Sequence, residues 1–97
     1  MINIVNIKSG QKYDFYAGRA NKTYNVQESI LANPFIIGKD GDRNEVIEKY
    51  KIYFYDRINK DKEFKEYVLS LKGLTGACWC VPNRCHLEII REYLQNN

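Results

Sequence analysis

The chain has 97 residues, of which 44% are hydrophobic and 28% charged. This is the size and composition of one folded domain, so we expect a single domain over residues 1–97 and exclude a two-domain enzyme and a disordered tail. No apolar run approaches the roughly 20 residues that a membrane span needs, which predicts a soluble protein without a membrane partner. The formal net charge of +3 is small and its charges are interspersed, which argues against a nucleic-acid partner.

The first third of the chain favours β-structure and a loop. Hydrophobic residues alternate with Asn over residues 2–7 and predict a strand, and the aromatic stretch 13–17 predicts a second one. The turn at 8–12 between them predicts a hairpin. Residues 20–32 show no sustained period and predict a long loop, which we expect to face a ligand.

Two helices are expected in the middle of the chain. Asp42, with Glu45 three residues later, has the pattern of a capping box and predicts a helix that ends at residues 59–60. Asp61 predicts the start of a second helix, which Gly73 ends.

The last part of the chain predicts a buried strand and one more helix. Residues 74–80 are small, apolar or thiol-bearing and lie between a glycine and a proline, as in a buried strand. Leu87, Ile90 and Leu94 recur at helical spacing. The expected order is therefore β-β-α-α-β-α, an α/β domain with a short sheet packed by helices.

The junction between this strand and the last helix is a candidate binding site. In α/β folds the carboxyl end of a strand and the next helix N-terminus bind anions, because free backbone N–H groups and the helix dipole attract negative charge. We expect Asn83 or Arg84, after a tight turn at Pro82, to open the helix, and Arg84 to offer a charged fork to a phosphate. The alternative is that Asn83 only caps the helix and Arg84 is only solvated.

Cys78, Cys80 and Cys85 lie close together, and an odd number of cysteines without a secretion signal predicts reduced thiols. With His86 they are zinc-compatible ligands, but no second ligand pair lies elsewhere, and we expect no metal and no cofactor. The spacing from Cys78 to Arg84 is that of tyrosine phosphatases, without their glycine. Cys85 beside the only histidine is a candidate nucleophile, whereas packing beneath a sheet is the role expected for Cys78 and Cys80.

The aromatic residues suggest a stacking surface. Trp79 alternates with the cysteines and is either a core residue of the second face or a platform for a base. Tyr16 and Arg19, at the end of the second strand, are expected to complete such a pocket. Tyr13 and Phe15 are more typical of a core.

Four motifs follow one another in the chain: Gly-Arg, Asn-Pro-Phe, Cys-Trp-Cys-x-Pro and Cys-His, at residues 18–19, 33–35, 78–82 and 85–86. This series resembles a small domain family of unknown function found widely in phages and bacteria. The abundance of Ile, Lys, Asn and Tyr, whose codons are AT-rich, favours a low-GC bacterium or phage as the source. Two features depart from the family, namely the long segment 20–32 and Leu87 where members often have Gly, so ligand specificity is expected to differ.

Small phage proteins of this kind are similar in size to viral sponges that sequester cyclic nucleotide signals of antiphage defence. The resemblance implies a non-enzymatic, cytoplasmic binder of a cyclic dinucleotide such as 3'3'-cGAMP, or of a cyclic ADP-ribose type signal. A domain this small hardly encloses such a ligand, which predicts a homo-oligomer, either a dimer or a tetramer. The alternative is a small nucleotide- or nucleoside-processing enzyme that uses Cys85 and His86. The expected ligand-binding residues are Tyr16, Arg19, Asn33, Phe35, Trp79, Asn83, Arg84 and His86.

Overall fold

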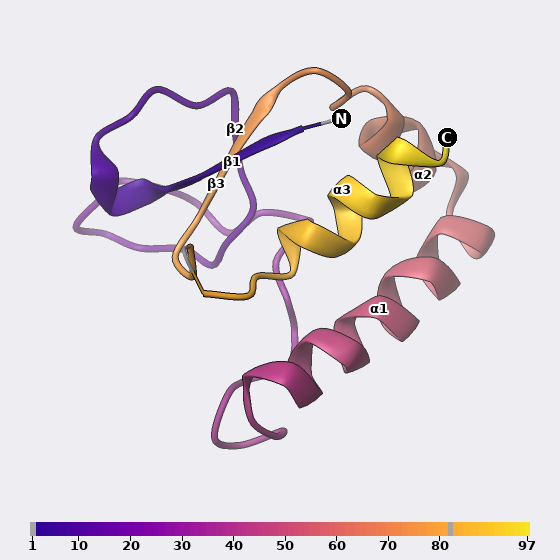
Figure 1. The fold of residues 1–97 in the computed structure, drawn as a ribbon, viewed down its shortest axis with the longest axis horizontal. Helices are drawn as coiled ribbons and strands as arrows, with labels where there is room; N and C mark the ends of the chain where they lie inside the picture. Colours follow the sequence, from indigo (N-terminus) through magenta and orange to yellow (C-terminus); the bar gives the residue numbers. More distant parts are fainter. Residues whose placement is uncertain (1, 82) are drawn as a thin grey trace.

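The computed structural model describes residues 2–81 and 83–97, so the predicted turn residue Pro82 lies outside the described residues. A small sheet, α3 and α1 follow one another across the molecule (Figure 1). This confirms a small α/β domain in which helices pack a short sheet. Among the described residues, no helix is both long and apolar enough to cross a membrane. The elements in chain order are β1 (Asn3–Asn6), the 3-10 helix η1 (Ile7–Ser9), β2 (Phe15–Tyr16), α1 (Arg43–Lys60), α2 (Lys62–Leu69), β3 (Thr75–Cys78) and α3 (Leu87–Gln95).

The strand order is β1-β3-β2, and both outer strands run parallel to β3. The predicted hairpin between the first two strands is therefore wrong, because β3 lies between them. The residues from Gly76 to Cys78 are all buried, as expected for the central strand of a parallel sheet. Gly76 also leaves room for the ring of Phe15, since a Cβ there would lie 2.5 Å from Phe15 Cζ.

The helix starts are as the sequence predicts. Asp42 Oδ1 accepts from the Glu45 N–H (2.9 Å), and Glu45 Oε1 accepts from the Asp42 N–H (3.1 Å), which completes the capping box of α1. Asp61 Oδ1 accepts from the Phe64 N–H (3.1 Å) at the start of α2. α2 ends at Leu69, before the predicted end at Gly73, and a turn covers the difference.

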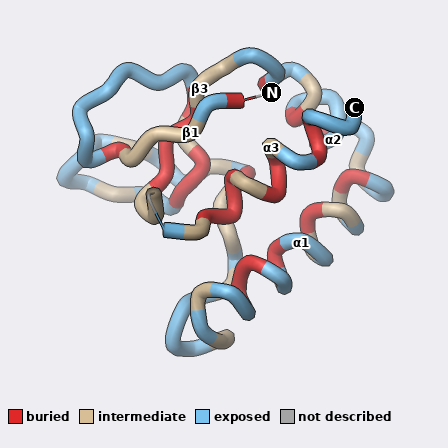
Figure 2. The backbone as a smooth tube through the Cα atoms, viewed as in Figure 1, coloured by how far each residue is buried: buried red, intermediate tan, exposed pale blue. Residues whose placement is uncertain are grey.

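The core is built around Phe54 of α1, which is fully buried. Its ring lies 5.9 Å from that of Tyr50, 5.8 Å from that of Phe64 in α2 and 5.6 Å from that of Tyr93 in α3. The red segments of the three helices in Figure 2 correspondingly turn toward one another. Burial of each such ring contributes about 1.5–3 kcal/mol, so these contacts set α1 at a fixed position beside α3.

The segment from residue 17 to residue 42 crosses from β2 to α1 with two isolated bridges and no longer strand or helix. Hydrogen bonds within the segment hold it in place, because Arg19 Nη2 donates to the carbonyl oxygens of Asn33 (2.8 Å) and Phe35 (3.2 Å). Asn33 Nδ2 in turn donates to the Val46 carbonyl of α1 (3.2 Å). These bonds hold residues 33–37 beside the first turns of α1.

Candidate functional site

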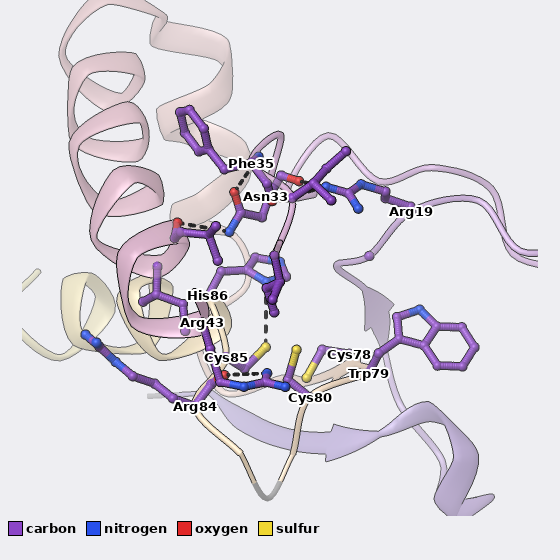
Figure 3. A pocket seen from close by; sticks show the side chains of 15 residues that line it. Arg19, Asn33, Phe35, Arg43, Cys78, Trp79, Cys80, Arg84, Cys85 and His86 are labelled. Carbon is purple, nitrogen blue, oxygen red and sulfur yellow. Dashed lines mark hydrogen bonds between the residues drawn. The ribbon is translucent and has the colours of Figure 1, made fainter. Parts of the chain in front are cut away.

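A pocket of about 320 Å³ lies where the end of β3, the first turns of α1, the residues preceding α3 and the segment 33–37 meet (Figure 3). This volume is at the small end of the range typical of ligand-binding pockets, which is roughly 300–1,000 Å³. Its lining combines apolar and aromatic side chains with three arginines, three cysteines and one histidine. The lining residues are Gly18, Arg19, Asn33, Phe35, Ile36, Ile37, Arg43, Val46, Ile47, Cys78, Trp79, Cys80, Arg84, Cys85 and His86.

Six of the eight expected ligand-binding residues line this pocket: Arg19, Asn33, Phe35, Trp79, Arg84 and His86. Tyr16 lies behind the wall, where its hydroxyl accepts from Trp79 Nε1 (2.6 Å) and donates to the Arg19 carbonyl. Asn83 is exposed and is not among the described residues of the lining. Chain segments far apart in the sequence thus bring most of the set together.

The N-terminus of α3 differs from the expectation. The helix begins at Leu87, so the prediction that Asn83 or Arg84 opens it is wrong. The Asn83 N–H instead donates to the Cys80 carbonyl (2.7 Å) and closes a turn. The Cys85 N–H donates to the Glu88 carboxylate (3.0 Å), and the Glu88 N–H donates to the Cys85 carbonyl (3.0 Å). These backbone donors are therefore already engaged within the protein.

Three thiols converge at the pocket wall in Figure 3. The Cys85 sulfur lies 3.6 Å from Nδ1 of His86, within hydrogen-bonding distance for sulfur. Cys78 and Cys85 are each 1% exposed, whereas Cys80 is only half-buried. Of the three sulfurs, Cys80 offers the most accessible one.

The three thiols differ in pKa. The S–H of Cys85 is the donor to both neighbours and is buried, which raises the pKa of Cys85. The bond from Cys85 and the backbone N–H groups of Cys80 and Val81 lower the pKa of Cys78 to about 7. The pKa of Cys80 falls to about 6, because its sulfur accepts from Cys85 and from the guanidinium of Arg43. Both pKa values lie below that of an ordinary thiol, and only Cys80 has a guanidinium among the causes.

Arg43 is the charged residue of the described pocket lining that sequence reasoning missed. It is the first residue of α1, and its Nη1 donates to the Arg84 carbonyl (3.2 Å), which fixes the guanidinium beside Cys80. The only available signal was its position directly after the N-cap Asp42. No local pattern links α1 to the cysteine segment some 40 residues later.

His86 lines the pocket as a neutral side chain. Its Nε2 lies 2.7 Å from the Ala17 carbonyl, and a carbonyl only accepts, so Nε2 carries the hydrogen. Burial lowers the pKa of His86 to about 4, and the ring packs 4.9 Å from that of Tyr50. A weakly basic, fully engaged imidazole beside a protonated Cys85 does not favour this pair as general base and nucleophile.

Arg84 turns toward α1. Its Nη1 donates to Asn44 Oδ1 (3.2 Å), and its Nη2 lies 3.4 Å from Glu48 Oε2. The guanidinium therefore does not cradle the Cys78 sulfur in the manner of a phosphatase loop. Within the described part of the chain, no group of three or more His, Cys, Asp or Glu side chains is arranged to hold a metal ion.

Trp79 forms the aromatic end of the pocket. Its ring meets that of Tyr24 edge to face, with centroids 5.1 Å apart, and the ammonium of Lys8 lies 5.7 Å from its centroid. Together with the bond to Tyr16, these contacts fix the indole in one orientation. Phe35, with Tyr53 edge to face at 6.4 Å, forms part of the opposite wall.

Comparisons with known proteins agree with a phage-associated domain. The model of the family described as "Domain of unknown function (DUF4326)" matches residues 4–96. The chain is similar to an uncharacterized 12.4 kDa protein in the nrdA-td intergenic region of Enterobacteria phage T4, with 38% identity over 55 residues, 56% of this chain and 51% of the relative. The chain thus spans about half the length of this curated relative. No solved structure matches the chain.

Proposed function

This chain belongs to the DUF4326 family of domains of unknown function, and we propose that it binds a nucleotide-type anionic small molecule in the pocket beside β3, without turning it over. The observation that carries this proposal is the combination of three arginines with aromatic and apolar walls in one pocket of about 320 Å³. Apolar walls with a few placed polar groups are the usual composition of small-molecule sites.

The two kinds of lining group suit the two parts of a nucleotide. Trp79 and Phe35 supply aromatic rings to the lining, and stacking of a base on such a ring is worth about 1–3 kcal/mol. Arg19 and Arg43 bring guanidinium groups, which recognise phosphate oxygens through paired N–H donors. The backbone bonds from Arg19 Nη2 orient that guanidinium in advance of binding, which reduces the entropy lost on binding.

The size of the pocket bears on the ligand and on assembly. A volume of about 320 Å³ suits one nucleotide unit, and a cyclic dinucleotide has two. We therefore propose that a cyclic dinucleotide such as 3'3'-cGAMP, or a cyclic ADP-ribose type signal, is enclosed between copies of the chain in a dimer or tetramer. The similarity to a phage protein supports a role in the host cytoplasm, where sequestration of such a signal would counter antiphage defence.

The test combines thermal shift, native mass spectrometry and ligand recovery across a panel of cyclic dinucleotides and cyclic ADP-ribose isomers. A sponge raises the melting temperature and releases unchanged ligand after denaturation. Arg43→Gln should weaken binding about 10- to 100-fold, as expected for loss of a charge-assisted hydrogen bond. Arg91→Gln removes the same charge from α3, outside the pocket lining, and should leave binding within about twofold.

Two results would contradict the proposal. If no ligand of the panel shifts the melting temperature or is retained by the protein, the proposal that the chain binds a nucleotide is refuted. Recovery of a converted product would favour the alternative, a small nucleotide- or nucleoside-processing enzyme. The protonated Cys85 and the neutral His86 are a poor nucleophile and base, so such an enzyme would have to use a different thiol.

A further inference from the structure

We propose that Cys80 is a nucleophilic site that reacts with small anions bearing an electrophilic carbon, held in the pocket by Arg43. This inference rests on the proposed function only in using the same pocket, and it does not require the ligand to be a nucleotide. Three observations lead to it: the accessibility of Cys80, the groups that its sulfur accepts from, and the charge around it.

Accessibility separates Cys80 from the other two thiols. All three cysteines line the pocket, but Cys78 and Cys85 are each 1% exposed, whereas Cys80 is half-buried. Cys78 is the last residue of β3 and belongs to the hydrophobic core. A bound molecule therefore meets Cys80 before it meets the other sulfurs.

The groups facing the Cys80 sulfur favour its thiolate. Figure 3 shows the Cys85 thiol and the guanidinium of Arg43, in the first turn of α1, beside the Cys80 side chain, and both lower the pKa of Cys80. Cys78 is the remaining titratable neighbour, and it competes for the same S–H of Cys85. Of the three thiols, only Cys80 has Arg43 among the groups that lower its pKa, so the thiolate is favoured on the half-buried thiol that lines the pocket. The thiolate, rather than the thiol, is the nucleophile.

The charge around Cys80 selects the class of reagent. Arg43 lies beside the sulfur, and Arg19 and Arg84 also line the pocket, so an anion is attracted to the same place as the thiolate. On a ligand with a carbonyl or an activated ring carbon, the sulfur forms an S–C bond as the π bond breaks. The electron pair moves to the adjacent oxygen or nitrogen, which takes a proton from water. This is an addition with no leaving group and no oxidant, and it is reversible.

Alkylation with a matched pair of reagents tests the inference, using iodoacetate as the anionic probe and iodoacetamide as the neutral one. In both reactions the sulfur displaces iodide, the S–C bond forms as the C–I bond breaks, and the thiol proton passes to solvent. Peptide mass spectrometry locates the modified residue. We expect Cys80 to react first, with a rate that is half-maximal near pH 6. The iodoacetate-to-iodoacetamide rate ratio should be about tenfold higher for Cys80 than for glutathione, since about 1.4 kcal/mol of charge attraction has that effect on a rate.

Variants test the roles of Arg43 and of the individual thiols. Arg43→Gln should return the rate ratio toward that of glutathione and shift the pH midpoint upward, whereas Arg91→Gln should change neither. Cys80→Ser should abolish fast alkylation, and Cys78→Ser should preserve it. The wild-type experiment stands even where a variant fails to fold, because the modified peptide identifies the reactive residue directly.

The outcomes distinguish this inference from the proposed function. If Cys80 has the pH midpoint and rate ratio of glutathione, or if Cys78 or Cys85 is modified first in the native protein, the inference is refuted even where nucleotides bind. If Cys80 behaves as expected and no nucleotide of the panel binds, the inference holds and the proposed ligand class is wrong.

Discussion

Acidification from pH 7 to pH 5 should destabilise the protein through His86. This imidazole is buried and donates from Nε2 to the Ala17 carbonyl, and its pKa falls from 6.5 to about 4 on folding. Between these values the unfolded chain binds a proton that the folded chain does not. The stability from His86 is therefore complete above pH 6.5 and is lost as pH falls toward 4.

The size of the effect follows from these two pKa values. Each pKa unit corresponds to about 1.4 kcal/mol, so the complete loss is about 3 kcal/mol, of which about 2 kcal/mol occurs between pH 7 and pH 5. This is a large share of the roughly 5–15 kcal/mol by which domains are stable. Cys80 contributes in the same direction, because its pKa is lowered on folding to about 6 and its stabilising thiolate is lost as pH falls through that value.

The assay is urea unfolding followed by circular dichroism at pH 7 and pH 5, for the wild type and for His86→Gln. The Gln amide keeps an N–H donor for the Ala17 carbonyl but does not titrate, so the comparison subtracts the contributions of Cys80 and of the carboxylates. The wild type should lose about 2 kcal/mol more than the variant over this interval. Equal losses in the two proteins would show that His86 is not held neutral by burial, and the reasoning would be refuted.

Two further predictions concern the scaffold around the pocket. Gly76→Ala should cost about 1–3 kcal/mol of unfolding free energy and broaden the near-ultraviolet spectrum, because the new Cβ would lie 2.5 Å from the ring of Phe15. An unchanged urea midpoint would contradict the packing of Phe15 of β2 against Gly76 of β3. Asp42→Ala should cost about 1 kcal/mol through loss of the α1 N-cap, whereas Asp42→Asn should cost less than half of that; equal costs for the two variants would mean that the cap bond to Glu45 does not stabilise α1.

Bonds within the protein explain why the start of α3 is not an open anion site. The Glu88 carboxylate accepts from the Cys85 N–H, and the Glu88 N–H donates to the Cys85 carbonyl. Negative charge at a helix N-terminus is favourable whatever its source. Here the Glu88 carboxylate supplies that charge, so a bound anion would depend on the arginine side chains rather than on backbone N–H groups.

Much of the secondary structure follows from local sequence. The starts of α1 and α2 depend on bonds that Asp42 and Asp61 make to residues three positions later. Such short-range bonds form in any tertiary context, which is why a sequence pattern predicts them. Most of the candidate site was predictable for a related reason, since Arg19, Trp79 and Arg84 each stand at the end of a predicted strand or just after one.

The order of the strands and the chemistry of the pocket were decided only by the tertiary structure. β3 pairs with β1 across some 70 residues, and no turn pattern near residues 8–12 reveals that a later strand will separate the first two. The acidity of Cys80 likewise depends on Arg43, nearly 40 residues away in the sequence, and on packing that leaves this thiol only half-buried. Local bonds are encoded in neighbouring residues, whereas burial and long-range charge arise only when the folded core brings distant segments together.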